Sequence, residues 1–162
     1  MDRTQIVSLL RALSEAGVGY VLIGGLALNL HGLVRATEDV DLLLDPSADN
    51  VERLRLALRS IYDDPEIEKI EAADLAGNYP VIRYVPPGDS PPIDFISRLG
   101  TAFAYEDANW QVIDLDGVTV RVATPESLYI MKHRTARARD QDDASRLARA
   151  FHLGRNAGNE ED

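Results

Sequence analysis

Residues 19–45, with the sequence GYVLIGGLALNLHGLVRATEDVDLLLD, decide the fold, because an apolar run, a glycine pair and an acidic strand follow one another. The apolar run 19–23 is bounded by glycines and is predicted to form a buried strand. The pair Gly24-Gly25 follows at once, and we expect residues 26–31 to form a helix. Residues 36–45 are predicted to form a second strand. The stretch therefore indicates a strand, a tight turn, a helix and a further strand.

The rest of the chain extends this alternation of helices and strands. Helices are expected over 4–16, 49–60, 124–137 and 140–151, and strands over 79–85, 93–96, 110–113 and 118–122. The order predicts an α/β (α+β) fold, a mixed sheet flanked by helices with further helices at the C-terminus. Residues 63–78 show no clear pattern. We expect one domain over 1–153 and a disordered acidic tail over 154–162.

Composition narrows the classes of function. The 162 residues contain no cysteine, which excludes thiolate metal sites and cysteine nucleophiles. No apolar run is long enough to span a membrane, and the N-terminus does not resemble a signal peptide, so a cytoplasmic protein without membrane contact is expected. Lys and Arg total 17 against 27 for Asp and Glu, a net charge of -10. This charge argues against bulk binding of nucleic acid but permits a polyphosphate bridged by metal ions.

Asp39 and Asp41 are the first candidate site residues. They stand two apart on a predicted strand, so their side chains point to the same side with roots about 6.5 Å apart. Two carboxylates in this arrangement can hold a pair of metal ions, and Mg²⁺ prefers carboxylate and phosphate oxygens. The alternative is a solvated strand end. Val40, Leu42 and Leu44 fall on the opposite face, where they can pack.

The glycine pair favours the metal site over that alternative. Gly24 and Gly25 follow a strand and open a helix, where backbone N–H groups point outward and a phosphate can approach closely. A tight strand-to-helix turn would also explain them. An anion site and an acid pair at matching strand ends are better explained together than apart.

These residues resemble a known family. Gly24-Gly25, thirteen intervening residues and Asp39-Val40-Asp41 are similar to the signature of the DNA polymerase beta-like nucleotidyltransferase superfamily. The segments Gly24 to Leu28 and Arg35 to Asp41 resemble its minimal and AbiEii-toxin-like bacterial branches. The resemblance implies the nucleotidyltransferase fold and transfer of a nucleoside monophosphate from an NTP to a hydroxyl, with two Mg²⁺ ions. Most members carry a serine where this chain has Gly25, which leaves one phosphate contact to backbone.

The resemblance also suggests roles for residues elsewhere. Asp94, between Ile93 and Phe95, is the candidate for the family's third acid, which holds the catalytic metal and helps deprotonate the attacking hydroxyl. An acid on the wet face of an edge strand is the alternative. Thr37 matches a small hydroxyl at the nucleotide site, although it could simply bond locally. Lys132 matches a base that meets the triphosphate, and the alternative is a solvated basic helix face.

Weaker matches concern Arg35 and the acids near the C-terminus. Arg35 could reach a phosphate or lie on the surface. Asp140 and Asp143 are similar to a run that ends many such domains, and we expect them to cap and pin the last helix.

The leading hypothesis is a Mg²⁺-dependent nucleotidyltransferase that binds an NTP such as ATP. The resemblance implies a toxin–antitoxin context with a protein or tRNA acceptor; the sequence leaves a protein, tRNA or small molecule open. One alternative is a non-catalytic binding or antitoxin module of the same fold. Another is an unrelated α/β domain in which the acids are structural.

Overall fold

A mixed six-stranded sheet forms the centre of the protein, with strands in the order β3-β4-β2-β1-β8-β7. The computed structural model describes residues 2–77, 80–99, 103–133 and 138–154. The strands of this sheet are β1 (Tyr20–Ile23), β2 (Val40–Leu44), β3 (Val81–Tyr84), β4 (Ile93–Ile96), β7 (Trp110–Leu115) and β8 (Val118–Ala123). A separate two-stranded sheet pairs β5 (Arg98–Leu99) with β6 (Phe103–Ala104). The predicted fold class is confirmed.

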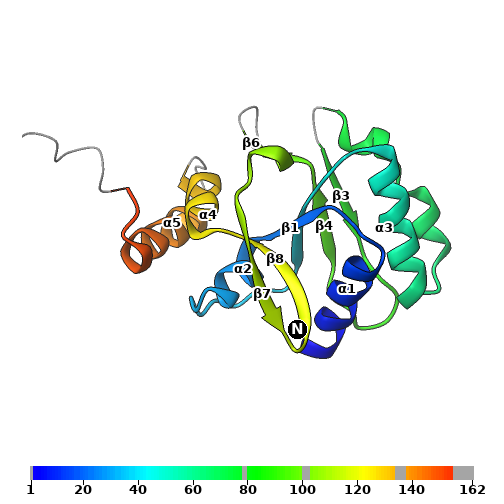
Figure 1. Cartoon of the computed structure of the whole chain (residues 1–162), viewed down its shortest axis with the longest axis horizontal. Helices are drawn as coiled ribbons and strands as arrows, with labels where there is room; N and C mark the ends of the chain where they lie inside the picture. The colour runs from blue at the N-terminus through cyan, green and yellow to red at the C-terminus, as the bar shows by residue number, and fades with distance from the viewer. Residues whose placement is uncertain (1, 78–79, 100–102, 134–137, 155–162) are drawn as a thin grey trace, which may run out of the picture.

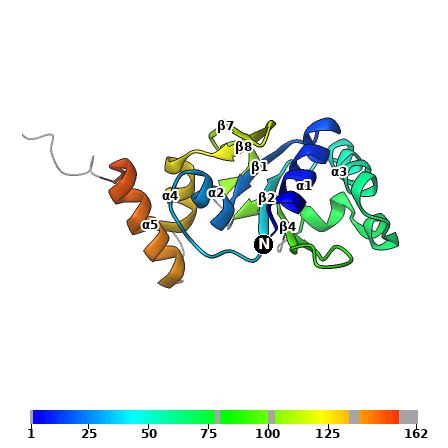
Figure 2. The same cartoon turned by 90° about the horizontal axis from the view of Figure 1, so that it is seen from below.

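Helices flank the sheet. The α-helices in the described residues are α1 (Arg3–Glu15), α2 (Gly24–Leu30), α3 (Ala48–Ile61), α4 (Pro125–His133) and α5 (Ala138–Phe151), and the 3-10 helices are η1 (Pro65–Lys69), η2 (Ala72–Leu75) and η3 (Tyr105–Asp107). The helices α1 and α3 pack together against the sheet, whereas α4 and α5 lie together at the opposite end of the molecule (Figures 1 and 2). None of the helices in the described ranges has the length and apolar character needed to cross a bilayer.

Local signals explain where the first helices begin. The Asp2 carboxylate accepts a hydrogen bond from the Thr4 backbone N–H and caps α1, and Gly17 follows the helix with φ +68°. The Ser47 hydroxyl accepts from the Asn50 N–H at 3.3 Å and caps α3.

Strand directions bring distant parts of the sequence to the same end of the sheet. Strand β1 pairs antiparallel with β2, and β2 pairs parallel with β4. The C-terminal end of β1, which leads into Gly24, therefore lies beside the N-terminal ends of β2 and β4. Val40, Leu42, Leu43 and Leu44 of β2 are fully buried, as the alternation had predicted for three of them, and they hold this end to the core.

The strand predicted over 36–45 is wrong at its start, because β2 begins only at Val40. Backbone groups of the preceding segment form hydrogen bonds with side chains instead of with a neighbouring strand. The Arg35 N–H donates to the Asn29 side chain at 2.9 Å, and the carbonyls of Val34 and Ala36 accept from Arg146 and Arg139 of α5. Asp39 consequently lies just before the strand and only Asp41 lies within it.

Other boundaries shift by less. The helix expected from Leu26 begins at Gly24, and the strand expected over 79–85 covers Val81–Tyr84. The unassigned stretch 63–78 contains η1 and η2, whose short 3-10 turns leave no helical periodicity in the sequence. The expected continuation of α4 to residue 137 and residues 155–162 of the predicted tail lie outside the described residues.

Candidate active site

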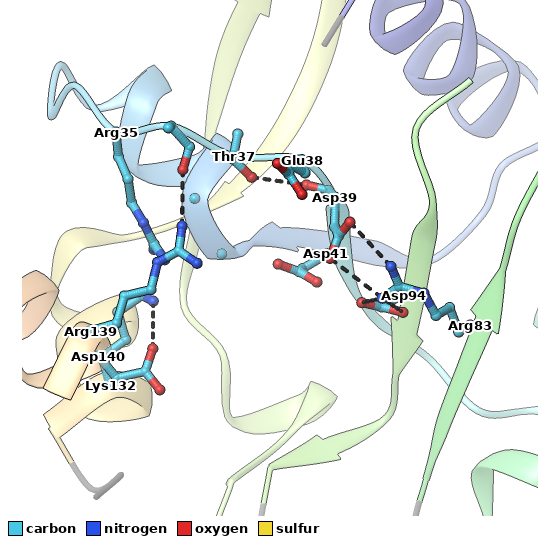
Figure 3. A pocket seen from close by; sticks show the side chains of 13 residues that line it. Arg35, Thr37, Glu38, Asp39, Asp41, Arg83, Asp94, Lys132, Arg139 and Asp140 are labelled. Atoms are coloured by element: carbon cyan, nitrogen blue, oxygen red, sulfur yellow. Dashed lines mark hydrogen bonds and ion pairs between the residues drawn. The ribbon is translucent and has the colours of Figure 1, made fainter. Parts of the chain in front are cut away.

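A polar cavity of about 600 Å³ opens at the end of the sheet where β1 ends and β2 and β4 begin. Its lining comes from the glycine turn, the segment before β2, the strands β2, β3 and β4, and the helices α4 and α5 (Figure 3). The lining residues are Gly24, Gly25, Arg35, Ala36, Thr37, Glu38, Asp39, Asp41, Arg83, Asp94, Lys132, Arg139 and Asp140. All seven residues predicted for the site therefore line one cavity.

Three of these residues, Asp39, Asp41 and Asp94, form what we call the acid cluster. Asp41 and Asp94 occupy partner positions on the parallel strands β2 and β4, so their side chains emerge side by side. Asp39 reaches the same cavity from the turn before β2. The side chain of Asp39 is 35% exposed and that of Asp94 is 16% exposed. Asp94 thus lies in the cavity, not on a wet edge away from it.

Crowding of like charges alters the protonation of Asp41. Burial raises the pKa of Asp41 to about 6, and the negative charges of Asp94 and Asp39 add to the rise. A hydrogen bond with the Asp94 side chain acts in the same direction, while the positive charge of Lys132 opposes it. Asp41 thus binds a proton more readily than an isolated carboxylate does, chiefly because it is buried and further because two acids lie beside it.

Arg83 is the residue that the sequence analysis missed. It lies on β3 opposite Asp94 of β4, and its guanidinium reaches the Asp94 carboxylate at 3.1 Å and the Asp39 carboxylate at 3.3 Å. Hydrogen bonds to Asp39 and the charge of Asp94 raise the pKa of Arg83 above its ordinary value. A signal was available in the sequence, since the strand predicted over 79–85 carries an arginine and is followed directly by the strand of the third acid, 93–96.

The glycine turn fits closely against the acid cluster and against Thr37. Gly24 has φ +73°, and a Cβ atom there would lie 2.2 Å from Oδ2 of Asp41. A Cβ atom on Gly25 would lie 2.9 Å from Cβ of Thr37. Both approaches need glycine. The Thr37 hydroxyl donates to the Asp39 carbonyl at 3.1 Å, so the local bond considered for Thr37 does form while the residue lines the cavity.

Lys132, Asp140, Asp143 and Arg35 form a second group, here called the buried network. Lys132 contacts Asp143 at 2.9 Å and Asp140 at 3.2 Å, and Arg35 also pairs with Asp143. The side chains of Lys132 and Arg35 are only 11% and 14% exposed. The solvated-face and surface alternatives for these two residues are therefore wrong. Asp143 pins α5 to α4 and to the segment before β2, as expected, but the expected cap is wrong, because Asp140 and Asp143 lie within α5.

The donor set of the acid cluster suits a divalent cation of the magnesium type, because carboxylate oxygens are the ligands that hard cations prefer. The Arg83 guanidinium, which contacts two of the three carboxylates, shows that a cation is accommodated there. In the described ranges, no group of three or more His, Cys, Asp or Glu side chains already converges to hold a metal ion. The residue types fit a metal, and their side chains would have to turn toward it.

Comparisons with known proteins agree with this geometry. A crystal structure of ANT(2'')-Ia with adenylyl-2''-tobramycin is similar with a TM-score of 0.55 and 14% identity, covering 92% of this chain and 88% of that one. A solution structure of the same antibiotic-resistance factor gives a TM-score of 0.54 and 15% identity, covering 92% of this chain and 83% of that one. At these identities the similarity shows the fold alone. No curated protein sequence matches the chain significantly.

A family model decides the assignment. The model described as nucleotidyl transferase AbiEii toxin, type IV TA system, matches residues 8–152. This match confirms the predicted family, the enzyme class and the toxin–antitoxin context. Because the match covers most of the sequence, the chain belongs to the AbiEii family of nucleotidyltransferase toxins.

Proposed function

We propose that this nucleotidyltransferase is Mg²⁺-dependent, binds an NTP in the cavity described above and moves its nucleoside monophosphate to an acceptor hydroxyl. The hydroxyl oxygen bonds to the α-phosphorus as the bond between the α- and β-phosphates breaks, and pyrophosphate leaves. The observation that carries the proposal is the meeting of three carboxylates, Asp39, Asp41 and Asp94, with the Gly24-Gly25 turn in one cavity. Carboxylates alone would repel a triphosphate. Their presence beside the glycine turn, where a phosphate could approach the backbone, makes sense when cations lie between the carboxylates and the triphosphate.

The acid cluster would hold two Mg²⁺ ions, with Asp39 and Asp41 as shared ligands and Asp94 completing the site. The ions, when bound, neutralise charge that develops at the reacting phosphate. Asp94 would also accept the proton of the attacking hydroxyl, because it lies in the cavity beside Asp41 and remains 16% exposed to an incoming acceptor. The two strands fix these side chains, so the protein contributes mainly positioning.

The nucleotide would lie against the other lining residues. Gly24 and Gly25 present backbone without side chains, so a phosphate can approach closely. Thr37, next to this backbone, would orient the nucleotide. Lys132 supplies a positive charge to the same cavity from α4. Its pairing with Asp140 and Asp143 fixes the ammonium group at the position from which it would meet the triphosphate.

A hydroxyl of a protein, a tRNA or a small molecule would serve as acceptor. The similar ANT(2'')-Ia structure is a complex with adenylyl-2''-tobramycin, so a protein of this fold binds an adenylylated small molecule. The net charge of -10 favours a protein or a small molecule over a nucleic acid, because a nucleic acid needs a positive footprint. A gel shift with tRNA at low salt separates these classes.

Transfer of label from α-³²P-labelled NTPs in the presence of Mg²⁺ and cell lysate tests the proposal. We expect labelled acceptor with the wild-type chain. Asp94→Asn should reduce transfer by about a hundredfold or more, the scale seen when one preorganised catalytic group is removed. Asp89→Asn is a matched control, because Asp89 is an exposed acid that does not line the cavity, and it should transfer normally.

Two results would contradict the proposal. One is the absence of label transfer together with the absence of nucleotide binding by the wild-type chain, as a non-catalytic module would show. The other is normal transfer by Asp94→Asn.

A further inference from the structure

Arg83 contacts the two outer members of the acid cluster at once. Its Nη1 lies 3.3 and 3.1 Å from the two carboxylate oxygens of Asp94, and its Nη2 lies 3.3 Å from Oδ1 of Asp39. One guanidinium therefore bridges acids from two different parts of the chain, the turn before β2 and the strand β4. Figure 3 shows it on the opposite side of the three carboxylates from Lys132 and Arg139.

The position of Arg83 makes it a substitute for a metal ion. The proposed metals need oxygens of Asp39 and Asp94, and the guanidinium already engages both side chains. A divalent cation and a guanidinium cannot share the same oxygens closely, because their charges repel each other at short range in a partly desolvated site. When metal binds, the arginine has to move away.

The Arg83 side chain is also free enough to move away from the acid cluster. Its side chain is 51% exposed and extends from β3, which is an edge strand of the sheet. The contacts of 3.1 to 3.4 Å are long for charge-assisted hydrogen bonds, and exposed ion pairs contribute little to stability. Lys132 differs in both respects, since it is 11% exposed and held by two carboxylates that are largely buried.

We infer that Arg83 is an internal counter-ion that occupies the metal position of the acid cluster in the metal-free protein and competes with the metal for Asp39 and Asp94. It reduces the repulsion among the three acids when no metal is present. It also raises the metal concentration at which the site fills, so a metal that arrives with the triphosphate is favoured over free metal. The inference rests on the proposed function, because it takes the acid cluster to be the metal site.

Binding of Mn²⁺ to the full chain without nucleotide, measured by calorimetry, tests the inference. We expect Arg83→Gln to bind Mn²⁺ about three- to tenfold more tightly than the wild-type chain, the range set by the loss of two exposed ion pairs. Arg53→Gln is the matched control, because it removes the same charge from an exposed position of α3 away from the cavity. It should leave the affinity within about twofold of wild type, a change that general electrostatics on an exposed surface allows.

Unchanged or weaker Mn²⁺ binding by Arg83→Gln would overturn the inference, as would an equal gain in Arg53→Gln. If Arg83→Gln does not fold, Arg83→Lys serves instead, since a lysine lacks the fork that bridges two carboxylates, and a smaller gain in the same direction is expected. Labelled transfer by the wild-type chain reports separately on the proposed function. A failed competition with intact transfer therefore contradicts the role of Arg83 alone.

Discussion

The acid cluster and the buried network line the same cavity but differ in how far their charges are paired. In the acid cluster, three carboxylates lie together, and one half-exposed guanidinium, that of Arg83, contacts two of them. In the buried network, Arg35 and Lys132 meet Asp140 and Asp143, with side chains between 3% and 18% exposed. One group keeps an excess of negative charge near solvent, and the other pairs its charges away from it.

Under the proposed function, the acid cluster would bind cations, while the buried network would hold Lys132 in place for the nucleotide. Buried charges are tolerated when they are paired, so the buried network needs nothing from outside to be stable. The acid cluster has three carboxylates and one guanidinium in contact with them, and the charges of Asp94 and Asp39 add to the rise that burial causes in the pKa of Asp41. The proposed function would use this excess of negative charge to bind a cation. The comparison can be tested by removing single acids from each group.

The largest effect on stability is expected from Asp143→Ala. Asp143 is 2% exposed and pairs with both Arg35 and Lys132, so its removal leaves two basic groups without their shared carboxylate. We expect the free energy of unfolding to fall by about 3–5 kcal/mol. For a chain of this size that is a decrease in Tm of roughly 10 °C, measured by circular dichroism.

Asp142→Ala is the control, because Asp142 is the exposed neighbour on the same helix and carries the same charge. It should change Tm by no more than about 1–2 °C, as surface substitutions do. Equal losses in the two variants would show that α5 is sensitive to any substitution and that the buried network has no special role.

Sequence reasoning reached Asp39, Asp41 and the glycine turn because they depend on short-range rules, and it reached Asp94 through the family resemblance. Alternation along a strand places Asp41 opposite its buried neighbours, and a glycine pair after a strand marks close backbone approach. It missed Arg83, whose role depends on the register of β3 with β4. It also extended β2 back to residue 36, because the side chains that bind this segment come from α5, more than a hundred residues later.

The same limit applies to Lys132 and Arg35. The sequence shows that each is a basic residue in or near a motif that resembles the family's. Their burial, however, depends on the packing of α4 and α5 against the segment before β2. No local pattern contains that information. Tertiary contacts thus decided between the alternatives that the sequence had left open.

The stability of the metal-free protein should depend on pH through Asp41. Burial and the neighbouring acids raise the pKa of Asp41 from 3.8 to about 6, so between these values the folded chain binds a proton that the unfolded chain has lost. The contribution of Asp41 to stability is therefore fully present below pH 4 and is lost as the pH rises through about 6. Asp41→Asn removes this dependence, because asparagine does not ionise.

The quantity to compare is the free energy of unfolding of Asp41→Asn minus that of the wild-type chain, measured in EDTA. We expect this difference to be about 2–3 kcal/mol larger at pH 7.5 than at pH 4. Urea unfolding at the two pH values measures this difference. Saturating Mg²⁺ should reduce or reverse it, since only the wild-type chain keeps the carboxylate ligand. A difference between the chains that does not vary with pH would mean that burial and the neighbouring acids do not raise the pKa of Asp41.

The smallest effect tests whether the glycine turn sets the position of the acid cluster. Gly24→Ala adds a Cβ atom 2.2 Å from Oδ2 of Asp41 and strains a residue with φ +73°. Gly88→Ala is a matched control, because Gly88 has φ +78° but nothing within 4 Å of its added Cβ atom. Both variants bear the cost of positive φ, so their difference isolates the contact with Asp41. We expect Gly24→Ala to be less stable than Gly88→Ala by about 1–2 kcal/mol, the range for overpacking a well-packed position. Urea unfolding at pH 7.5 measures the difference, and equal losses would show that Asp41 moves aside freely. In that case the glycine turn would not determine where the acid cluster lies.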